Sequence, residues 1–279
     1  MPEEIEREHF YHAETTVLAG HLQLPLVQEI KPQLYAKLPE RGGYLSQHAG
    51  DYRLEGVISF RSAYTQVAGN LDPKPGHGWS TLATAAIEGL NVLDVVTADR
   101  VVGQISTEHP LVGYVPKVTF LGTRFENLRI AGHPVKLEVD PYLLGAKPDH
   151  DAPYASDPGF LERARRQYER IGANSGFPAE VLERYNRLPS TADTPESIEC
   201  SLVNQAEGSF PGRCFGHVIE VPDFGIVYLA TLRLEQSDFQ LGVPEQTLIK
   251  LTMIELKLGC LANGSAGFGS LIVNGHTKP

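Results

Sequence analysis

The stretch TLIKLTMIELKL, residues 247–258, decides the fold class of this chain. It contains no glycine or proline, and large apolar side chains occupy most of its positions. Both alternating faces are largely apolar at first, and one face then turns polar at Glu255 and Lys257. Apolar residues on both faces are typical of a strand with neighbours on both sides and layers above and below it. The stretch therefore predicts a strand that lies deep in a sheet before it emerges.

A second pattern occurs twice in the chain. Leu128–His133 reads LRIAGH, and Leu271–His276 reads LIVNGH. Alternation predicts a strand, and the glycine before histidine predicts a tight turn, so we expect one hairpin design to be used in both places. Gly132 and Gly275 are then expected at positive φ, or where another part of the backbone comes close.

Further alternating segments surround these two patterns, and together they predict 10 to 12 strands. Segments 81–87 and 92–102 are rich in Val, Thr and Ala and are separated by residues 88–91. A helix over 82–87 is the alternative, because alanine favours helices, but the β-branched neighbours favour a strand. The chain is predicted to be an all-β, mainly antiparallel barrel or sandwich. We expect one domain over residues 1–279, and two β halves, 12–140 and 197–279, are the alternative.

The segment between these halves has helical periodicity. Asp157 followed by Pro158 is a typical start of a helix, and Gly172 would end it. A second amphipathic helix is predicted from Pro178 to just before Pro189. Residues 156–189 are therefore expected to form an inserted helical hairpin.

Composition excludes several classes of protein. The net charge of −10 argues against nucleic-acid binding, which needs a clustered cationic surface. No segment approaches the roughly 18 apolar residues of a membrane-spanning helix. The acidic start lacks the pattern of a secretory signal, which favours a cytoplasmic location. Cys200, Cys214 and Cys260 lack close metal-site spacing, so we expect reduced and mostly buried thiols and no cofactor.

Two segments resemble the choice-of-anchor P group of bacterial β-rich proteins. Residues 89–101 read GLNVLDVVTADRV and residues 120–135 read FLGTRFENLRIAGHPV. The group's segments read roughly nvlgGlvTAdaV and t.f.nLtVnGtPv, so the resemblance covers about 50 residues. It implies an exported or surface-associated protein of no established catalytic activity, and it brings no functional residues. The group's leader and C-terminal anchor are not seen in this sequence.

Candidate site residues are scattered along the chain. His77 lies between Gly76 and Gly78, which allow close approach to a ligand, and Trp79 follows. With Tyr64 these residues predict a ligand-binding site. The alternative is a turn in which Trp79 packs into the core and His77 faces solvent. Glu108 and His109 are neighbours in an extended segment, so their side chains are expected on opposite faces.

A loop before the first predicted helix is rich in carboxylates. Asp149, Asp151 and Asp157 offer oxygen ligands that suit a hard cation such as Ca²⁺, but the glycine and distal glutamate of the EF-hand are absent. A surface loop without a metal is the alternative.

Two functions remain open at this point. The chain has no Walker loop and no nucleophile elbow, since Asn263 holds the first glycine position of that motif. The first hypothesis is a non-catalytic β-rich protein that binds a partner or associates with itself. The second is a small-molecule-binding β-barrel, an enzyme among the options, with its site near His77 and Trp79.

Overall fold

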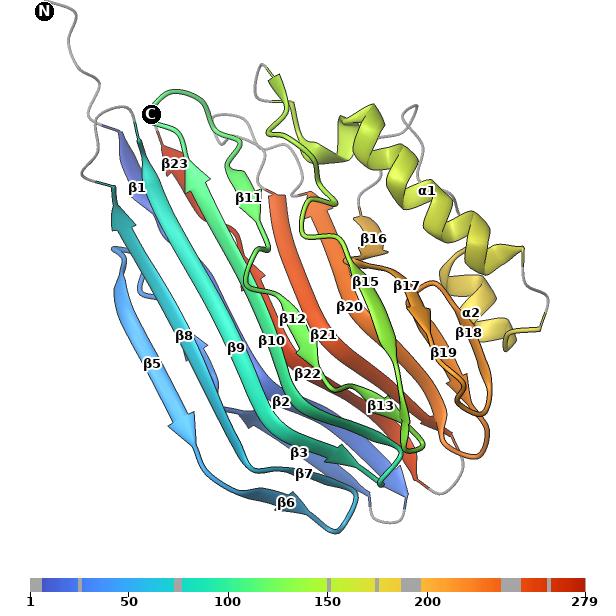
Figure 1. Ribbon diagram of the computed structural model, residues 1–279. Helices are drawn as coiled ribbons and strands as arrows, with labels where there is room; N and C mark the ends of the chain where they lie inside the picture. Colours follow the sequence, from blue (N-terminus) through green and yellow to red (C-terminus); the bar gives the residue numbers. More distant parts are fainter. Residues whose placement is uncertain are drawn as a thin grey trace, which may run out of the picture.

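The computed structural model describes residues 7–24, 27–72, 77–149, 152–173, 176–186, 197–236, 247–259 and 262–278. Most of these residues form antiparallel strands, which join into two large sheets and two small ones (Figure 1). Two short helices lie beside one edge of this β structure (Figure 1). The expected all-β, mainly antiparallel class is confirmed.

The first large sheet has 10 strands and is built around the long hairpin of β9 and β10. Its strands are β5 (Gly43–Ala49), β6 (Tyr52–Leu54), β7 (Ile58–Phe60), β8 (Ser62–Leu71), β9 (Trp79–Val92), β10 (Val96–His109), β11 (Lys117–Thr119), β12 (Arg124–Glu126), β13 (Arg129–Ile130) and β14 (His133–Pro134). Strands β7 and β8 follow one another along β9, and β11, β12 and β13 follow one another along β10. Segment 82–87 is thus a strand, as the sequence favours.

The second large sheet has 9 strands and a centre in the order β20, β21, β22, β2. Its strands are β2 (Ala13–Leu24), β3 (Gln28–Gln33), β4 (Ala36–Lys37), β16 (Ser197–Ser201), β18 (Arg213–Phe215), β19 (Val218–Val221), β20 (Gly225–Gln236), β21 (Thr247–Gly259) and β22 (Asn263–Val273). Strand β21 has a neighbour on each side from Ile249 to Leu258. The prediction of an interior strand over 247–258 is confirmed.

The two small sheets join distant parts of the chain. Strand β1 (Glu8–Phe10) pairs with β23 (His276–Lys278), and β15 (Lys136–Val139) pairs with β17 (Val203–Glu207). The first of these pairs brings the two ends of the described chain together (Figure 1).

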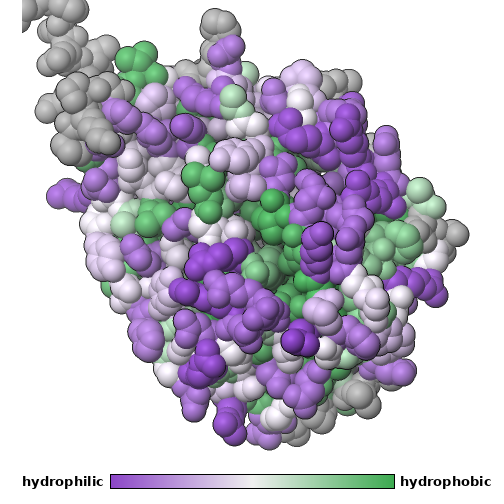
Figure 2. All heavy atoms as spheres, viewed as in Figure 1, coloured by the Kyte–Doolittle hydropathy of each residue, from purple (hydrophilic) through white to green (hydrophobic). Residues whose placement is uncertain are grey.

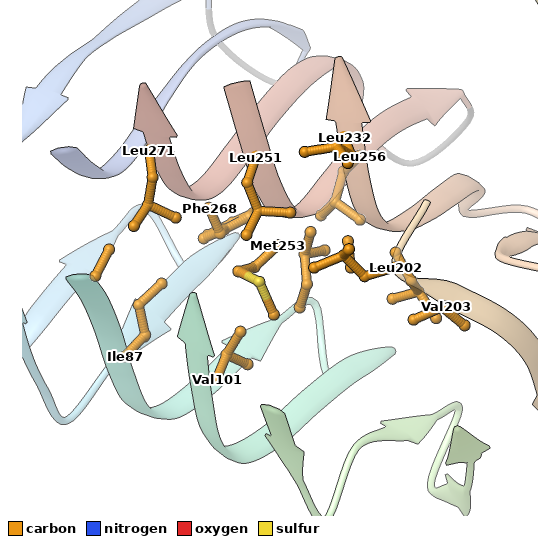
Figure 3. Packing of buried hydrophobic residues seen from close by; sticks show 14 of the residues in the cluster. Ile87, Val101, Leu202, Val203, Leu232, Leu251, Met253, Leu256, Phe268 and Leu271 are labelled. Carbon is orange, nitrogen blue, oxygen red and sulfur yellow. The ribbon is translucent and has the colours of Figure 1, made fainter. Parts of the chain in front are cut away.

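The two large sheets face each other across one hydrophobic core. Figure 3 shows Ile87 and Val101 of the first sheet pointing toward Leu251, Phe268 and Leu271 of the second. All five are almost completely buried, and burying a side chain of this size contributes about 1.5–3 kcal/mol. None of the sheets closes on itself, so the barrel alternative is wrong. The long strands bury one face each against the other sheet, and closure is not needed to cover that face.

The two helices are α1 (Pro158–Gly172) and α2 (Ala179–Arg184), and the short 3₁₀ helix η2 (Tyr154–Ser156) precedes them. Asp157 caps α1 by accepting a hydrogen bond from the Phe160 amide at 2.6 Å, as its position before Pro158 predicts. Helix α2 is shorter than the sequence predicts and ends at Arg184; residues 187–190 lie outside the described part of the chain.

The helices are packed closely against the β structure. Phe160 and Leu161 of α1 are fully buried in the main core. Tyr168 of α1 and Tyr185, just after α2, join a second cluster over the outer face of β19 and β20. The helices therefore cover the β19–β20 side of the second sheet, and α2 also contacts the outer face of β21 through the Arg184–Glu255 and Glu180–Lys257 ion pairs.

The repeated sequence pattern does not form the same structure twice. Leu128–His133 is a hairpin in which Ala131 and Gly132 have φ of 48° and 79°. Leu271–His276 instead joins β22, which pairs with β21 and β2, to β23, which pairs with β1. The expectation of a second hairpin is wrong, because the partners of this segment come from distant parts of the chain.

The separation expected at residues 88–91 is also absent. Strand β9 runs through to Val92, and the chain turns at Leu93 and Asp94, whose φ values are 52° and 56°. Gly89 has a φ of 64° within the strand, and the register with β10 is the same before and after it, with Glu88 opposite Arg100 and Leu90 opposite Ala98. Gly89 therefore forms a local irregularity within β9 and not a turn between two strands.

The outer face of the first sheet is mostly hydrophilic. Figure 2 shows polar side chains over most of this view and a smaller group of hydrophobic residues in a hollow near its centre. Among the described residues, no helix has the length and apolar character needed to cross a membrane.

Candidate ligand-binding groove

The four central strands of the second sheet share an irregularity in their alternation. Residues 226–232 of β20 and 251–254 of β21 form longer buried runs, and on β22 and β2 two successive residues are buried, where strict alternation would expose every second one. The buried pairs at the same level of the sheet are Leu229 and Ala230, Met253 and Ile254, Phe268 and Gly269, and Val17 and Leu18. They lie side by side in the register, and Ala230 and Gly269 have φ of 45° and 61°. The outward face of β21 thus carries Lys250 and Thr252 before this row and Glu255 and Lys257 after it.

Small polar side chains follow one another across the outer face next to this row. Thr231, Thr252, Ser270 and Thr16 are cross-strand neighbours on four successive strands. The next outward row contains Gly267 beside Glu255. Small side chains leave space above the sheet, and a hollow of about 470 Å³ lies here. This volume is in the range of small-molecule sites.

One side of the hollow is lined by ion pairs between the sheet and the helical segment. Arg184 binds both carboxylate oxygens of Glu255, at 2.9 and 2.8 Å, and also donates through Nε to Glu199. Glu199 in turn accepts a hydrogen bond from Arg233 at 2.7 Å. The Arg184 guanidinium also lies 4.1 Å from the centre of the Tyr228 ring. Bidentate pairing and ring stacking are geometries that arginine favours and lysine cannot reproduce.

The balance between burial and ion pairing sets the charge states of this cluster. Burial would raise the pKa of Glu199, but Arg184 and Arg233 outweigh it and lower the pKa, so the carboxylate is ionised at neutral pH. Burial would likewise lower the pKa of Arg184, and the carboxylates of Glu255 and Glu199 raise it instead. Behind the cluster, Tyr185 is hydrogen-bonded to His217 at 2.8 Å, and burial lowers the pKa of His217 to about 3. His217 is therefore neutral and is sealed from the groove.

Lys250 adds a further cation to the hollow. It lies directly across from Arg233 on the neighbouring strand, with its side chain on the same face. Like charges directly opposite each other on a sheet are destabilising unless something neutralises them. Arg233 pairs with Glu199 at 2.7 Å and with Glu235 at 3.7 Å, and none of the ion pairs found among the described residues includes Lys250. The lining holds three cations, Arg184, Arg233 and Lys250, against two carboxylates, Glu199 and Glu255.

A second hollow continues the groove along the same strands. It has a volume of about 660 Å³ and lies beside the Lys257–Glu180 ion pair of 2.5 Å. Its lining is acidic, because Glu180, Glu220 and Asp223 outnumber Lys257. The two ends of the groove therefore differ in charge, and only the smaller hollow carries a cationic excess.

The residues predicted as a ligand site lie elsewhere and do not converge. His77 is hydrogen-bonded to Glu108 at 2.8 Å, and both side chains are partly exposed. Trp79 points to the other face of the first sheet, where its ring stacks on His9 at 5.0 Å. Tyr64 pairs with Ala86 on β9, seven residues from Trp79 along the strand. The structure thus matches the alternative of a Trp79 packed against the core.

The predicted separation of Glu108 and His109 is confirmed, and His109 belongs to a buried cluster. Its ring lies 4.6 Å from that of His9, and its Nε2 is 2.7 Å from the Gly275 carbonyl oxygen. His9 Nδ1 is 3.0 Å from the Thr277 hydroxyl. Burial is the largest cause that lowers the pKa of His9 to about 3 and of His109 to about 4. As neutral side chains, these two rings connect β1 and β10 with the C-terminal segment that includes β23.

The structure describes only two of the three carboxylates that were predicted as ligands of a cation. Asp157 is engaged by the start of α1, Asp149 lies just before the undescribed residues, and Asp151 is outside the described part of the chain. Within the described ranges no three metal-ligating side chains gather at one point. Cys200 is a buried free thiol and Cys214 a half-buried one, as expected, whereas Cys260 lies outside the described residues.

Sequence reasoning missed the groove because its residues are spread over the whole chain. Thr16 and Ser270 are direct neighbours across β2 and β22, although they are 254 positions apart in sequence. The local signal was the presence of four polar residues, Lys250, Thr252, Glu255 and Lys257, on a strand that is otherwise mostly apolar. To recognise a site from these residues, one would have to know the register of the four strands that carry it.

Comparisons with known proteins place the chain in one family. A family model described as a domain of unknown function (DUF8256) matches residues 9–235. The match covers most of the chain, so the protein belongs to the DUF8256 family. No curated protein and no solved structure matches it.

Proposed function

We propose that this member of the DUF8256 family is a non-catalytic binding protein for a small anionic ligand that carries hydroxyl groups, such as a sugar phosphate. The ligand would occupy the 470 Å³ hollow on the outer face of the second sheet. In this proposal a β-sandwich is the scaffold, and the inserted helical hairpin supplies one wall of the groove.

The observation that carries the proposal is the cross-strand pair of Arg233 and Lys250. Two cations side by side on one face lower stability unless an anion lies between them or near them. Glu199 is shared between two arginines and Glu235 lies 3.7 Å from Arg233, but none of the ion pairs found among the described residues joins either carboxylate to Lys250. A phosphate or carboxylate group above Lys250 and Arg233 would remove this repulsion and gain charge-assisted hydrogen bonds.

The floor of the hollow supports a polyhydroxylated body for the ligand. Thr16, Thr252 and Ser270 present hydroxyl groups that both donate and accept hydrogen bonds. The carboxylates of Glu199 and Glu255 at the side are acceptors for ligand hydroxyls. A purely apolar ligand would cover the hydroxyl groups without giving them hydrogen bonds, which costs free energy.

The arrangement supports binding more than catalysis. The titratable groups that the hollow exposes are ion-paired arginines, carboxylates and one lysine. His217 and Tyr185, the neighbouring groups with acid–base chemistry, are completely enclosed. A general acid or base must reach the proton that it transfers, and these two side chains do not reach the hollow.

Isothermal titration calorimetry with three probes tests the proposal. At low ionic strength we expect the protein to bind glucose 6-phosphate more tightly than inorganic phosphate, and glucose more weakly than either. Added salt should weaken the binding, because the hollow is open to solvent. Equal affinity for glucose and glucose 6-phosphate would contradict an anion site.

Two lysine variants locate the binding. Lys250→Gln should lower the affinity for glucose 6-phosphate by roughly tenfold, which corresponds to about 1.4 kcal/mol. Lys117→Gln, at an exposed position of β11, is the matched control and should leave the affinity unchanged. An equal loss in both variants would indicate a general charge effect, and no loss in either would place the ligand elsewhere.

A further inference from the structure

One glycine in the lining of the smaller hollow is required neither by the backbone conformation nor by packing. Gly267 lies in the interior of β22 and does not have a positive φ, and a Cβ built on it would have Thr252 Cγ2 as its nearest neighbour, at 3.6 Å. That distance is an ordinary van der Waals contact. Every other glycine in the interior of a described strand has either a positive φ or an atom closer than 3.0 Å to the place of a Cβ. The fold therefore does not explain the glycine at position 267.

A glycine without a structural reason is unfavourable in a strand. It loses more conformational freedom on folding than any other residue, and it has no side chain to pack against its neighbours. Such a glycine often marks a place where a ligand or another part of the backbone comes close. Among the described residues, and apart from the two adjacent in the chain, no backbone atom lies within 4 Å of the place of a Cβ at Gly267. A ligand is the explanation that is left.

We propose that Gly267 determines which ligands the smaller hollow accepts, because the ring of a cyclic sugar phosphate lies against the backbone of β22 at this position. This inference rests on the proposed function and makes it more specific. Lys250 and Arg233 would select for the anionic group, and Gly267 would select for a flat ring.

The cross-strand neighbours of Gly267 match the two kinds of surface that a sugar ring has. Ala19 on β2 offers a methyl group on one side, and Glu255 on β21 offers a carboxylate on the other. Arg184 binds both oxygens of Glu255, which fixes the carboxylate in place, and each oxygen can accept a further hydrogen bond. A pyranose has C–H groups on its face and hydroxyl groups at its rim. The face can therefore lie on Gly267 and Ala19 while a hydroxyl donates to Glu255.

The proposed ring position and the anion site are different parts of the hollow. Lys250 pairs with Ile272, and five residues of β22 separate Ile272 from Gly267. The flexible side chain of Lys250 can extend over part of this distance toward a phosphate that is attached to the ring. A change at Gly267 can thus alter contacts with the ring without removing the cations that bind the phosphate.

Isothermal titration calorimetry of Gly267→Val with two probes tests the inference. Inorganic phosphate should bind the variant and the wild type equally, because the cations are unchanged. Glucose 6-phosphate should bind the variant roughly tenfold or more weakly than the wild type, since valine occupies the place of the ring, and it should lose its advantage over inorganic phosphate. Gly267→Ala should show a smaller loss of the same kind. Ser265→Val is the matched control, because Ser265 lies two positions away on the same face of β22 and lines the second hollow, and this variant should bind both probes as the wild type does.

Thermal unfolding without ligand separates a role in binding from a role in the fold. Gly267→Val should melt at the wild-type temperature or above it, because valine favours strands. A lower melting temperature would overturn the inference, since the fold would then need this glycine. Wild-type affinity of Gly267→Val for glucose 6-phosphate would also overturn it and leave the proposed anion site intact, and so would an equal loss in Ser265→Val. A wild type that binds neither probe would refute the proposed function itself, and this inference with it.

Discussion

Replacing Glu199 with glutamine tests whether the ion pairs beside the groove hold the helical segment on the sheet. The Glu199 side chain is only 10% exposed and accepts hydrogen bonds from Arg184 and Arg233. Loss of one partner from a buried ion pair typically costs 3–5 kcal/mol, because it leaves the other charge without compensation. Arg184 keeps Glu255, and Arg233 is nearly half exposed, so we expect the lower end, about 3 kcal/mol.

The loss should be visible in both thermal and urea unfolding. At roughly 2–4 °C per kcal/mol for a chain of this size, the melting temperature should fall by about 6–12 °C. Glu126→Gln is the matched control, since Glu126 pairs with Arg124 at 2.8 Å but both side chains are nearly half exposed. An exposed pair contributes little, so this variant should change stability by less than about 0.5 kcal/mol. Equal effects of the two substitutions would refute the reasoning that burial makes the Glu199 cluster important.

Three further predictions concern other parts of the molecule. The three buried histidines, His9, His109 and His217, should make the protein less stable in acid. In the unfolded chain each has a pKa near 6.5 and takes up a proton below that pH, whereas in the folded protein its pKa is about 3 to 4 and the ring stays neutral. Stability should therefore be complete above pH 6.5 and fall below it, by up to about 2 kcal/mol per histidine at pH 5, and a melting temperature that stays constant from pH 7.5 to 5 would contradict this. Gly132→Ala should cost about 1 kcal/mol in urea unfolding for its φ of 79° alone, whereas Gly275→Ala should cost more, because its Cβ would lie 3.1 Å from both His9 and His109. Replacing residues 155–190 with a Gly/Ser linker should keep the β circular-dichroism signal but lower stability by several kcal/mol, since α1 contributes buried side chains to the main core; loss of that signal would show that the insertion is essential to folding.

The sequence predicted those features that depend on local patterns. Segment 247–258 lacks glycine and proline and is mostly apolar, which is typical of a long strand with a neighbour on each side. Asp157 before Pro158 marked the start of α1, because a cap acts within one turn of its helix. Opposite orientations of Glu108 and His109 followed from the two-residue period of a strand.

Features that depend on distant pairing were not predicted. Leu271–His276 has the local pattern of a hairpin, but its partners are β1, β2 and β21, and these override it. At Met253 and Ile254 the outward-facing positions of β21 shift by one residue, and this shift requires matching buried pairs on β20, β22 and β2. The groove depends on the pairing of distant strands and on this shift. Alternation in the sequence could therefore identify Lys250 as a polar residue on a mostly apolar strand, but it could not show that Lys250 belongs to a site.

The most direct test of the proposed binding function is a titration followed by residue-resolved NMR. Glucose 6-phosphate should shift the backbone amide signals of Thr16, Thr252 and Ser270 together, with one saturation curve, and leave those of His77 and Trp79 unchanged. A common saturation curve at residues of β2, β21 and β22, which are neighbours only in the folded sheet, would show that one ligand binds beside all three strands. Shifts confined to other surfaces, or no saturable shift at these three residues, would contradict the account.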